Sequence, residues 1–512
     1  MERRNGYFRL GGGFYWRCSH RMRFRPQNST AMKREVDSFG VITRRCGLAV
    51  LPDEVLRIIF EFVLECVYIS EFTFRPWPKW KAASKLSHVN QRFRSVMLAC
   101  PRFWTNMNSS SEMVVACFPR TKGLPLSVEL KVYQNRTTNQ CLLAPVLSKV
   151  LPLSKHWRKL RLEFEVSYEE GDEPALRKMP YHIIDAPLLE ELDVSHFNFE
   201  SHQAGLPRWN WALWNTPKLR RLDVVHHFPL SLPGLSSLVQ LEVDLRLDDN
   251  RLSQILRKIS QLPSLKDFVL QFSNVSQPEI RTFAALEVIR FTQVQRTQIK
   301  TRVHCEHEDI SPLLKLSIFS SLFFCGSTEL TIKLGRAYSG HIRDFFFNEE
   351  ISRIFRNKDQ FLLVEILCIV IASPYGGHYN PDTRAELCIP LNMLPNLKHL
   401  KLRSDMRFDL KEADETAGTN FEDELAIAPR VVGNVLPVLE TVTLDMPDPS
   451  VVAQWLGEYL RELKDRGKWE GFRELVVLEG ISSNEDDYQK VIYSGDGALD
   501  WCEDKNKTYD RK

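Results

Sequence analysis

A short motif, Pro-x-Leu-x-x-Φ-x-Φ with Φ an aliphatic residue or Phe, recurs along the chain and limits its possible folds more than any other feature. Five segments carry the motif, beginning at Pro187, Pro217, Pro263, Pro395 and Pro437. Two further units, Leu238-Leu241-Val243 and Leu286-Ile289-Phe291, lack the Pro, and Leu330-Ile332-Leu334 is a candidate unit within the long gap before Pro395. Chance alone predicts roughly 0.3 matches to the full motif in a chain of this composition, so the motif marks an internal repeat.

Each Φ-x-Φ stretch has the alternation of a short strand whose two Φ side chains point to the core, and the earlier Leu covers the preceding turn. Stacked units predict a parallel sheet with helices or loops on its other face. The pattern resembles the leucine-rich repeat, which implies an irregular solenoid of the α/β class. That family places Asn three residues after the last Φ, whereas this chain has residues such as His227, Asp405 and Pro447 there. We therefore expect other side chains or water to satisfy the backbone groups between turns, and unrelated βα units remain the alternative architecture.

Two amphipathic helices are predicted before the repeats. The first begins at Leu51-Pro52-Asp53-Glu54, where Pro suits a first helical turn and the acids favour the positive end of the helix dipole. The second covers residues 81–100 and ends before Pro101. The apolar positions of the two helices are Leu56, Ile59, Phe60 and Val63 in the first, and Leu86, Val89, Phe93, Val96 and Met97 in the second.

These helices and the Cys-Pro-Arg-Phe-Trp stretch at 100–104 resemble the F-box, in the form common among F-box proteins of mushroom-forming fungi. The opening Leu-Pro-Asp-Glu and the Leu-Ser-x-Val-x-x-x-Phe-Arg stretch that starts at Leu86 carry the likeness. The connection from Phe60 to Leu86 is longer than is usual in that family. Asn90 and Phe93 stand where the family usually has Cys and Trp.

By this resemblance, a Skp-type adaptor would bind the module at residues 47–106 and connect it to the cullin and RING subunits of an SCF ubiquitin ligase. Two short helices with large apolar residues at most turns are also too small to bury them all, so part of that surface is expected to meet a partner. The alternative is that both helices pack against the following domain. Adaptor docking, by direct contact or by holding the helices together, is assigned to Leu51, Pro52, Val55, Leu56, Ile59, Leu86, Val89, Phe93 and Trp104.

Candidate substrate-binding residues lie early in the repeats. Trp209, Trp211 and Trp214 are spaced i, i+2 and i+5, so they do not share one helical face and some are expected to be partly exposed. Exposed aromatic residues are common anchors at protein interfaces. His226 follows a predicted repeat strand at its C-terminal edge, where a binding residue can sit. The alternatives are that the Trp residues fill space between repeats and that His226 lies in a plain surface turn.

Charge is unevenly distributed. Residues 1–50 contain eleven Lys and Arg against three Asp and Glu, while the whole chain has a net charge of only +3. The body is therefore slightly acidic and lacks the basic stripe expected of a nucleic-acid-binding domain. Residues 1–46 are predicted to be a basic disordered tail, with a mitochondrial presequence or a mis-assigned start as alternatives. Lys411 to Glu424 is predicted to be an exposed acidic loop and 481–512 a polar tail.

No membrane segment is predicted. The longest apolar stretch, Phe361 to Ala372, is shorter than the roughly 20 residues that a spanning helix needs. The N-terminus has no apolar core of a signal peptide. The 11 cysteines follow no disulfide framework, so reduced thiols in the cytoplasm or nucleus are expected.

Catalytic chemistry is not predicted, because no nucleotide-binding, hydrolase or metalloprotease motif occurs. The cluster His304-Cys305-Glu306-His307-Glu308 fits no usual zinc spacing, so neither a metal nor a cofactor is expected. The body at 107–480 is expected to recognise a protein substrate, which makes the chain a non-catalytic substrate-recognition subunit of an SCF-type ubiquitin ligase. The alternative is a leucine-rich-repeat scaffold with a degenerate F-box that binds proteins without ubiquitin transfer.

Overall fold

A computed structural model of the chain divides into two compact units, one ending at Cys100 and the other beginning at Pro101. We call them the helical unit and the sheet unit. The division falls a few residues before the end of the 47–106 module expected from sequence. The basic segment 1–46, the acidic segment 411–424 and Trp209 lie outside the described residues. The structure describes residues 48–69, 79–108, 111–133, 150–165, 183–197, 210–226, 228–246, 251–273, 287–303, 318–336, 344–346, 350–351, 354–372, 384–387, 389–404, 408–410, 437–480 and 488–509.

The helical unit contains α2 (Asp53–Ile69), α3 (Lys79–Ser87) and α4 (Gln91–Ala99) after a short turn of 3-10 helix, η1 (Leu48–Val50). The first predicted helix is confirmed. The second prediction, one helix over 81–100, is wrong, because the chain breaks at Asn90 into α3 and α4. Asn90 has extended backbone (φ −159°), and its side-chain oxygen accepts a hydrogen bond of 2.8 Å from the backbone N–H of Phe93. Asn is a strong N-cap residue, so it begins a new helix where apolar periodicity alone predicts continuation.

The core of the helical unit lies along one side of α2. Leu56, Phe60 and Leu64 are buried, and the Phe60 ring meets the Phe93 ring edge-on at 4.9 Å. Arg92 fixes the start of α2 against α4: its guanidinium donates to the carboxylate of Asp53 at 2.7 and 2.9 Å and to the backbone carbonyl of Leu51. The unit is thus held by an apolar seam and one polar clamp.

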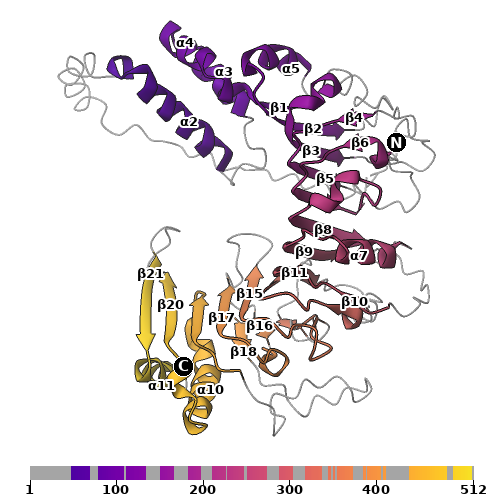
Figure 1. The fold of residues 1–512 in the computed structure, drawn as a ribbon. Helices are drawn as coiled ribbons and strands as arrows, with labels where there is room; N and C mark the ends of the chain where they lie inside the picture. The colour runs from indigo at the N-terminus through magenta and orange to yellow at the C-terminus, as the bar shows by residue number, and fades with distance from the viewer. Residues whose placement is uncertain are drawn as a thin grey trace, which may run out of the picture. The chain divides into compact units, whose positions relative to one another are not determined.

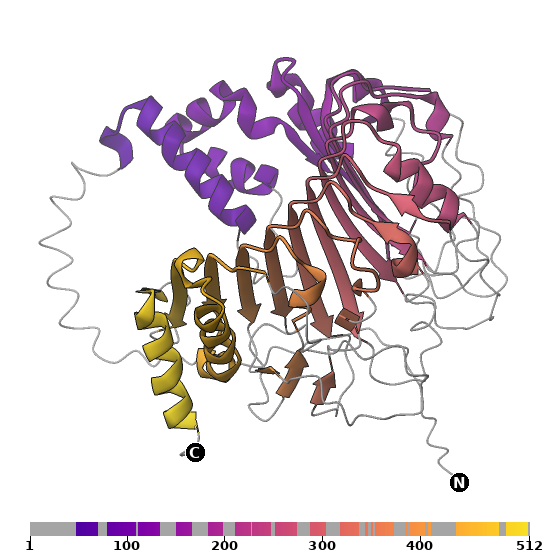
Figure 2. The ribbon, with the colours of Figure 1, turned by 60° about the horizontal axis from the view of Figure 1, so that its bottom comes forward.

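The sheet unit is built on one 14-stranded sheet in which every neighbouring pair is parallel except the last, β20–β21. The predicted α/β class with a large parallel sheet is confirmed. Figures 1 and 2 show the strands side by side in chain order, with β21 at the C-terminal edge. The strands are β1 (Asn106–Asn108), β2 (Leu126–Tyr133), β3 (Trp157–Glu165), β5 (Glu191–Phe197), β7 (Arg221–Val225), β8 (Gln240–Arg246), β9 (Asp267–Ser273), β11 (Arg296–Val303), β13 (Glu329–Arg336), β15 (Ile366–Ala372), β17 (His399–Ser404), β19 (Thr441–Asp445), β20 (Glu474–Gly480) and β21 (Tyr488–Ser494).

Smaller elements flank this main sheet. Short parallel sheets form from β4 (Ile184–Asp185) with β6 (Trp214–Asn215), from β10 (Ile289–Arg290) with β12 (Leu322–Phe323), and from β14 (Asp344–Phe346), β16 (Arg384–Leu387) and β18 (Phe408–Leu410). The helices are α5 (Ser111–Cys117), α7 (Leu252–Ser260), α10 (Ala453–Asp465) and α11 (Asp496–Tyr509). Among the described residues, no helix has both the length and the apolar character needed to cross a membrane.

The motif residues form two buried ladders across the main sheet. The first Φ of each unit pairs in register with the next, and all of these residues are nearly inaccessible to solvent. Continuous hydrophobic ladders of this kind bury one whole face of the sheet. The first ladder is Leu160, Leu192, Leu222, Leu241, Phe268, Thr297, Leu330, Leu367, Leu400, Val442 and Leu475, and the second is Leu162, Val194, Val224, Val243, Leu270, Ile299, Ile332, Ile369, Leu402, Leu444 and Val477.

One predicted unit is misassigned. The candidate unit containing Leu330 is confirmed in β13, but Ile289 lies in the small sheet with β12 rather than in the main sheet. The main-sheet strand of that repeat is β11, where Thr297 takes the place of the first Φ. Because Thr297 is polar, this strand does not match a motif that requires an apolar residue at that position. Phe291 instead joins a stacked row of rings with Phe324, at a centroid distance of 4.9 Å.

Side chains other than a repeated Asn satisfy backbone groups between turns, as expected. The buried Gln360 amide accepts from the backbone N–H groups of Arg356 and Asn357 at 2.7 and 2.8 Å and donates to the carbonyl of Leu322 at 3.0 Å. Ser237 donates to the Leu219 carbonyl at 3.0 Å. These two turns are therefore fixed by different side chains, and not by one residue repeated at a constant position.

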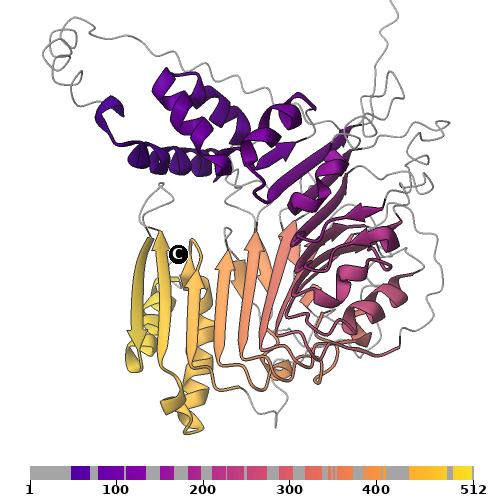
Figure 3. The same cartoon turned by 45° about the horizontal axis from the view of Figure 1, so that its top comes forward.

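The prediction of a polar tail over 481–512 is wrong for the part that the structure describes. β21 pairs with β20 along its whole length, and α11 packs against α10 and buries Trp501 and Cys502 (Figure 3). The segment contains many polar residues, and α11 buries only a narrow stripe of side chains, so composition alone did not predict this helix. This strand and helix cover the edge that β20 would otherwise leave open.

Candidate functional site

A second apolar face runs along α2 of the helical unit. Val55, Ile58 and Phe62 are 38%, 61% and 67% exposed, and their i, i+3, i+7 spacing places them on one side of the helix. Leu56 and Phe60, which face α3 and α4, occupy the other side. A helix that is apolar on both sides is normally buried on both sides. Exposed aromatic and aliphatic residues grouped in this way mark an interaction surface.

The structure separates the residues predicted for adaptor docking into three groups. Pro52, Val55 and Val89 are exposed; Leu51, Ile59 and Leu86 are half-buried; Leu56, Phe93 and Trp104 are buried. Trp104 belongs to the sheet unit, in the short helix η2 (Pro101–Trp104), where the Arg120 guanidinium lies over its ring at 4.8 Å. Only the first two groups are placed to touch another protein.

Ile58 and Phe62 are absent from the predicted docking residues, although they are the most exposed apolar side chains among those described in α2. They repeat at helical spacing from Val55, which was the available signal. The stripe through Leu56 and Phe60 already supplies the one apolar face that an ordinary surface helix needs, so it gives no reason to expect a second.

The predicted aromatic recognition surface of the repeats is not present in the described residues. Trp211 and Trp214 are 3% and 2% exposed and pack on each other with ring centroids 4.7 Å apart. They fill space between repeats, which was the alternative considered from sequence. His226 is half-buried with φ 70°, and its backbone N–H donates to the carbonyl of Asp244 at 2.7 Å. It therefore ends β7 in a tight turn.

The face of the main sheet opposite the buried ladders, here called the outer face, holds charged side chains in register. The x of each Φ-x-Φ motif points to this face because side chains alternate along a strand. One outer row contains Arg161, Asp193, Asp223, Glu242, Val269, Gln298, Thr331, Cys368, Lys401 and Thr443. Two residues further along each strand, the next outer row includes Glu163, Ser195, Asp244, Gln271, Lys300, Lys333, Val370, Arg403 and Asp445.

Apart from Arg161 on β3 and Asp445 on β19, the charges in these two rows are sorted along the sheet. An acidic cluster on β3 to β8 comprises Glu163, Asp193, Asp223, Glu242 and Asp244. A basic cluster on β11 to β17 comprises Lys300, Lys333, Lys401 and Arg403. The clusters meet where the Lys300 ammonium pairs with the Glu242 carboxylate across β9.

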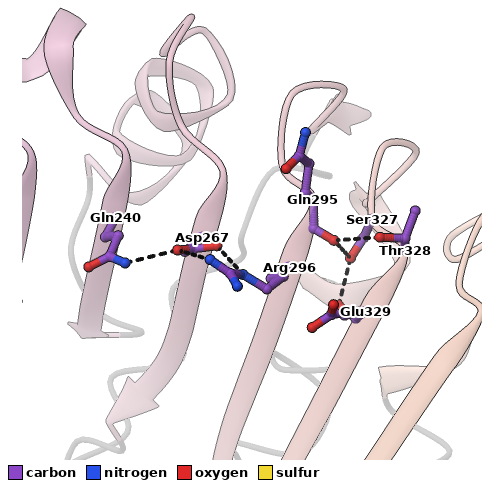
Figure 4. Close-up of polar contacts among 7 residues, drawn as sticks. All are labelled: Gln240, Asp267, Gln295, Arg296, Ser327, Thr328 and Glu329. Carbon is purple, nitrogen blue, oxygen red and sulfur yellow. Dashed lines mark hydrogen bonds and ion pairs between the residues drawn. The ribbon is translucent and has the colours of Figure 1, made fainter.

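The row at the other side of the motif has alternating charges instead. Gln240 donates to Asp267 at 3.0 Å, and the Arg296 guanidinium pairs with the same carboxylate (Figure 4). Farther along, the Lys159 ammonium lies 2.7 Å from the Glu191 carboxylate. Neighbouring opposite charges of this kind neutralise one another and support strand register. The sorted rows are therefore a separate feature of the face.

Asp223 is the centre of the acidic cluster. Its neighbours in register are Asp193 and Glu242, and it accepts no hydrogen bond from any described residue. Burial, followed by the two neighbouring carboxylates, raises the pKa of Asp223 to about 6. Burial also raises the pKa of Asp193, although the Arg161 guanidinium lies 3.3 Å away. Like charges crowded on adjacent strands favour binding of a cation or a proton.

At the basic end, the Lys333 and Lys401 ammonium groups are exposed and make no ion pair with the described residues, whereas Arg403 pairs with Asp445 at 3.1 Å. Together these cations flank Cys368 and Val370 of β15. Burial raises the pKa of the Cys368 thiol, opposed by the nearby cations. Cys368 is therefore a neutral thiol. The cationic groups of the basic cluster surround the uncharged side chains of Cys368 and Val370.

We predict that Asp223→Asn stabilises the sheet unit at neutral pH. The folded chain holds the Asp223 proton more tightly than the unfolded chain, because the pKa rises from 3.8 to about 6. Ionised Asp223 therefore lowers the free energy of unfolding above pH 6, and the penalty fades as the pH falls towards 4. The gain expected for Asn is about 1–2 kcal/mol at pH 7.5, reduced for partial solvent screening, and close to zero at pH 4.

Denaturant unfolding between pH 4 and 8 checks this difference. Asp267→Asn is the matched control with opposite sign. Burial raises the pKa of Asp267, but its hydrogen bonds from Arg296 and Gln240 lower it more, so the net shift is downward. That control should lose stability above pH 4 and recover as the pH falls. A gain for Asp223→Asn that is independent of pH would contradict the electrostatic explanation.

No group of three or more His, Cys, Asp or Glu side chains in the described part of the chain is arranged to hold a metal ion. The predicted loop around His304 to Glu308 lies outside the described residues. The described part of the chain presents an exposed apolar helix face on the helical unit and a charged sheet face on the sheet unit. In comparisons with known proteins, no family model matches the sequence and no curated protein shows significant similarity to it.

Proposed function

We propose that the chain is the substrate-recognition subunit of an SCF-type ubiquitin ligase. In this proposal the helical unit is an F-box that docks a Skp-type adaptor, and the sheet unit is an irregular leucine-rich-repeat-like solenoid that binds a protein substrate. The chain adds no catalytic group, and works by holding substrate near the cullin and RING subunits, where ubiquitin transfer occurs. Such a complex would act in the cytoplasm or nucleus.

The observation that supports the proposal best is the exposed face of α2. Val55, Ile58 and Phe62 form an apolar stripe on the 17-residue helix α2, whose opposite side already packs in the core of the helical unit. Fully burying one such side chain contributes about 1.5–3 kcal/mol, so a partner helix that covers this stripe gains several kcal/mol. The resemblance of the Leu-Pro-Asp-Glu opening at Leu51 to the F-box makes a Skp-type adaptor the expected partner.

The test is co-purification and affinity measurement of the full chain with the Skp-type adaptor of its source organism. Wild type is expected to bind with a Kd of about a micromolar or tighter. The double variant Ile58→Glu/Phe62→Glu should bind at least about 100-fold more weakly, because two desolvated apolar anchors become charged. Both side chains are mostly exposed, so the variant is expected to fold, which circular dichroism checks.

Val115→Glu is the matched control. Val115 is 67% exposed, as Phe62 is, but lies in α5 of the sheet unit. It should leave adaptor affinity unchanged. If wild type does not bind the adaptor, the alternative gains support: a repeat scaffold with a degenerate F-box that binds proteins without ubiquitin transfer. The long connection before Leu86 is the sequence feature that favours this alternative.

A further inference from the structure

The outer face of the main sheet separates charge along its length. Across the two sorted outer rows, the five carboxylates of the acidic cluster lie on β3, β5, β7 and β8, and the four cations of the basic cluster lie on β11, β13 and β17. The exceptions are Arg161 on β3, which pairs with Asp193, and Asp445 on β19, which pairs with Arg403. Such sorting costs stability, because like charges on adjacent strands repel. Alternating charges, as in the row of Asp267 and Arg296, are the arrangement that favours folding.

Each cluster contains charges that have no partner among the described residues. Asp223 on β7 accepts no hydrogen bond, and Lys333 on β13 and Lys401 on β17 form no ion pair among the described residues. Within the acidic cluster, the Ser195 hydroxyl is 5% exposed, lies on the same face as Asp193 and has no hydrogen-bond partner in the described part of the chain. Buried hydroxyl groups in folded proteins nearly always have a hydrogen-bond partner, so a bound ligand is one group that this hydroxyl can pair with.

We propose that the outer face binds an extended polypeptide segment of the substrate in which acidic and basic residues are segregated. Its acidic residues lie over the basic cluster, and its basic residues lie over the acidic cluster. The inference rests on the proposed function for its biological meaning, since it names the class of substrate. Its physical test needs only the chain and a peptide.

The geometry sets the spacing of the two charge blocks. Asp223 is separated from Lys333 by four strand steps and from Lys401 by six, following the strand order of the main sheet. At about 4.8 Å per step these separations are roughly 19 and 29 Å. An extended chain covers them with about six to nine residues at roughly 3.3 Å per residue. A segment lying across the strands thus needs blocks of opposite charge whose centres are that far apart.

Protein is favoured over nucleic acid by the same observation. A phosphate backbone would meet the basic cluster, but it would also meet Asp193, Asp223 and Glu242 on the neighbouring strands. Nucleic-acid-binding faces are positively charged along the whole path of the backbone. A segment with both signs of charge is the occupant that leaves neither cluster uncompensated.

The experiment measures fluorescence anisotropy of labelled peptides with the full chain at low and at physiological salt. The segregated peptide carries a Glu block and a Lys block separated by a neutral spacer of the length given above. The alternating peptide has the same composition and net charge but interleaves Glu with Lys. The segregated peptide is expected to bind at least about tenfold more tightly, with the difference shrinking as salt rises.

Two charge-reversed variants locate the binding. Lys333→Glu/Lys401→Glu should weaken binding of the segregated peptide by at least about tenfold, since it reverses two cations of the face. Lys218→Glu/Lys358→Glu makes the same change in net charge at two exposed lysines in connections outside the strands of the main sheet, and it should leave the affinity unchanged. If both variants weaken binding equally, the effect comes from the change in net charge and not from the outer face, and the proposal is overturned.

Three other outcomes would also overturn it: equal affinity for segregated and alternating peptides, full affinity for a peptide with the Glu block alone, or equally tight binding of a single-stranded oligonucleotide. Adaptor binding, measured on the same preparation, keeps the two proposals distinguishable. If the adaptor does not bind but the segregated peptide does, the charged face stands and the ligase role fails. The reverse result leaves the ligase role standing and rejects the proposed substrate class.

Discussion

A chain that ends at Gly480 is expected to aggregate and to lose at least about 3 kcal/mol of stability in the sheet unit. The truncation removes β21, which pairs with all seven residues of β20 from Glu474 to Gly480. It also removes α11, whose Trp501 and Cys502 are 5% and 0% exposed. Loss of a buried Trp alone costs about 3–5 kcal/mol. The edge of the sheet also moves from β21 to β20, so the backbone groups of β20 that β21 pairs become available to other chains.

The contact of α11 with α10 is close. A Cβ atom built at Gly457 of α10 would lie 3.2 Å from the Cβ atom of Cys502, so glycine permits this approach of the two helices. Light scattering after gel filtration and denaturant unfolding measure the two effects of truncation. A chain that ends at Tyr509 is the control and should behave as wild type. A monomeric Gly480 chain with an unchanged midpoint would mean that β21 and α11 contribute nothing to folding.

Phe324→Ala is expected to lower the free energy of unfolding of the sheet unit by about 3–5 kcal/mol. Phe324 is fully buried in a row of rings, with the Phe291 centroid at 4.9 Å and the Phe361 centroid at 5.5 Å, both nearly parallel to it. Its removal leaves a cavity between three successive repeats. Because each repeat is stabilised chiefly by its neighbours, a cavity in the middle of the row uncouples the two halves of the sheet.

Phe324→Leu is the graded control for this row. It keeps most of the apolar volume and loses the stacked ring, so its cost should be about 1–1.5 kcal/mol. Denaturant unfolding followed by both circular dichroism and tryptophan fluorescence measures the loss. The Ala variant should also broaden the transition, because the halves then unfold separately. Equal losses for Ala and Leu would show that the cavity is not the cause.

Where periodic apolar residues and burial coincide, sequence was enough to predict the fold. The motif locates the Φ positions in β5, β7, β8, β9, β17 and β19, because the inward-facing residues of these strands are apolar. The same reasoning failed in β11, where Thr297 sits in the first ladder, and at Asn90, where a capping side chain splits a helix. Whether a polar residue is buried or caps a helix depends on its contacts in the folded unit, and a sequence pattern does not contain those contacts.

The candidate site was less predictable than the fold. The spacing of Val55, Ile58 and Phe62 places them on one face of α2. Which of the two apolar faces is exposed depends on where α3 and α4 pack. Similarly, Trp211 and Trp214 resembled recognition residues and proved to be core. Exposure is a property of the assembled unit, so residue type alone could not assign it.

The periodic apolar residues alone predict a stack of short strands preceded by apolar helices, because few other folds bury such a pattern. Which charges become neighbours depends on how the strands pack. Asp223 lies 19 residues from Glu242 along the chain but faces it on the next strand, and Lys333 reaches the same part of the sheet as Arg403. Register between strands sets these contacts, and register is fixed by the packing of the whole core rather than by any local segment.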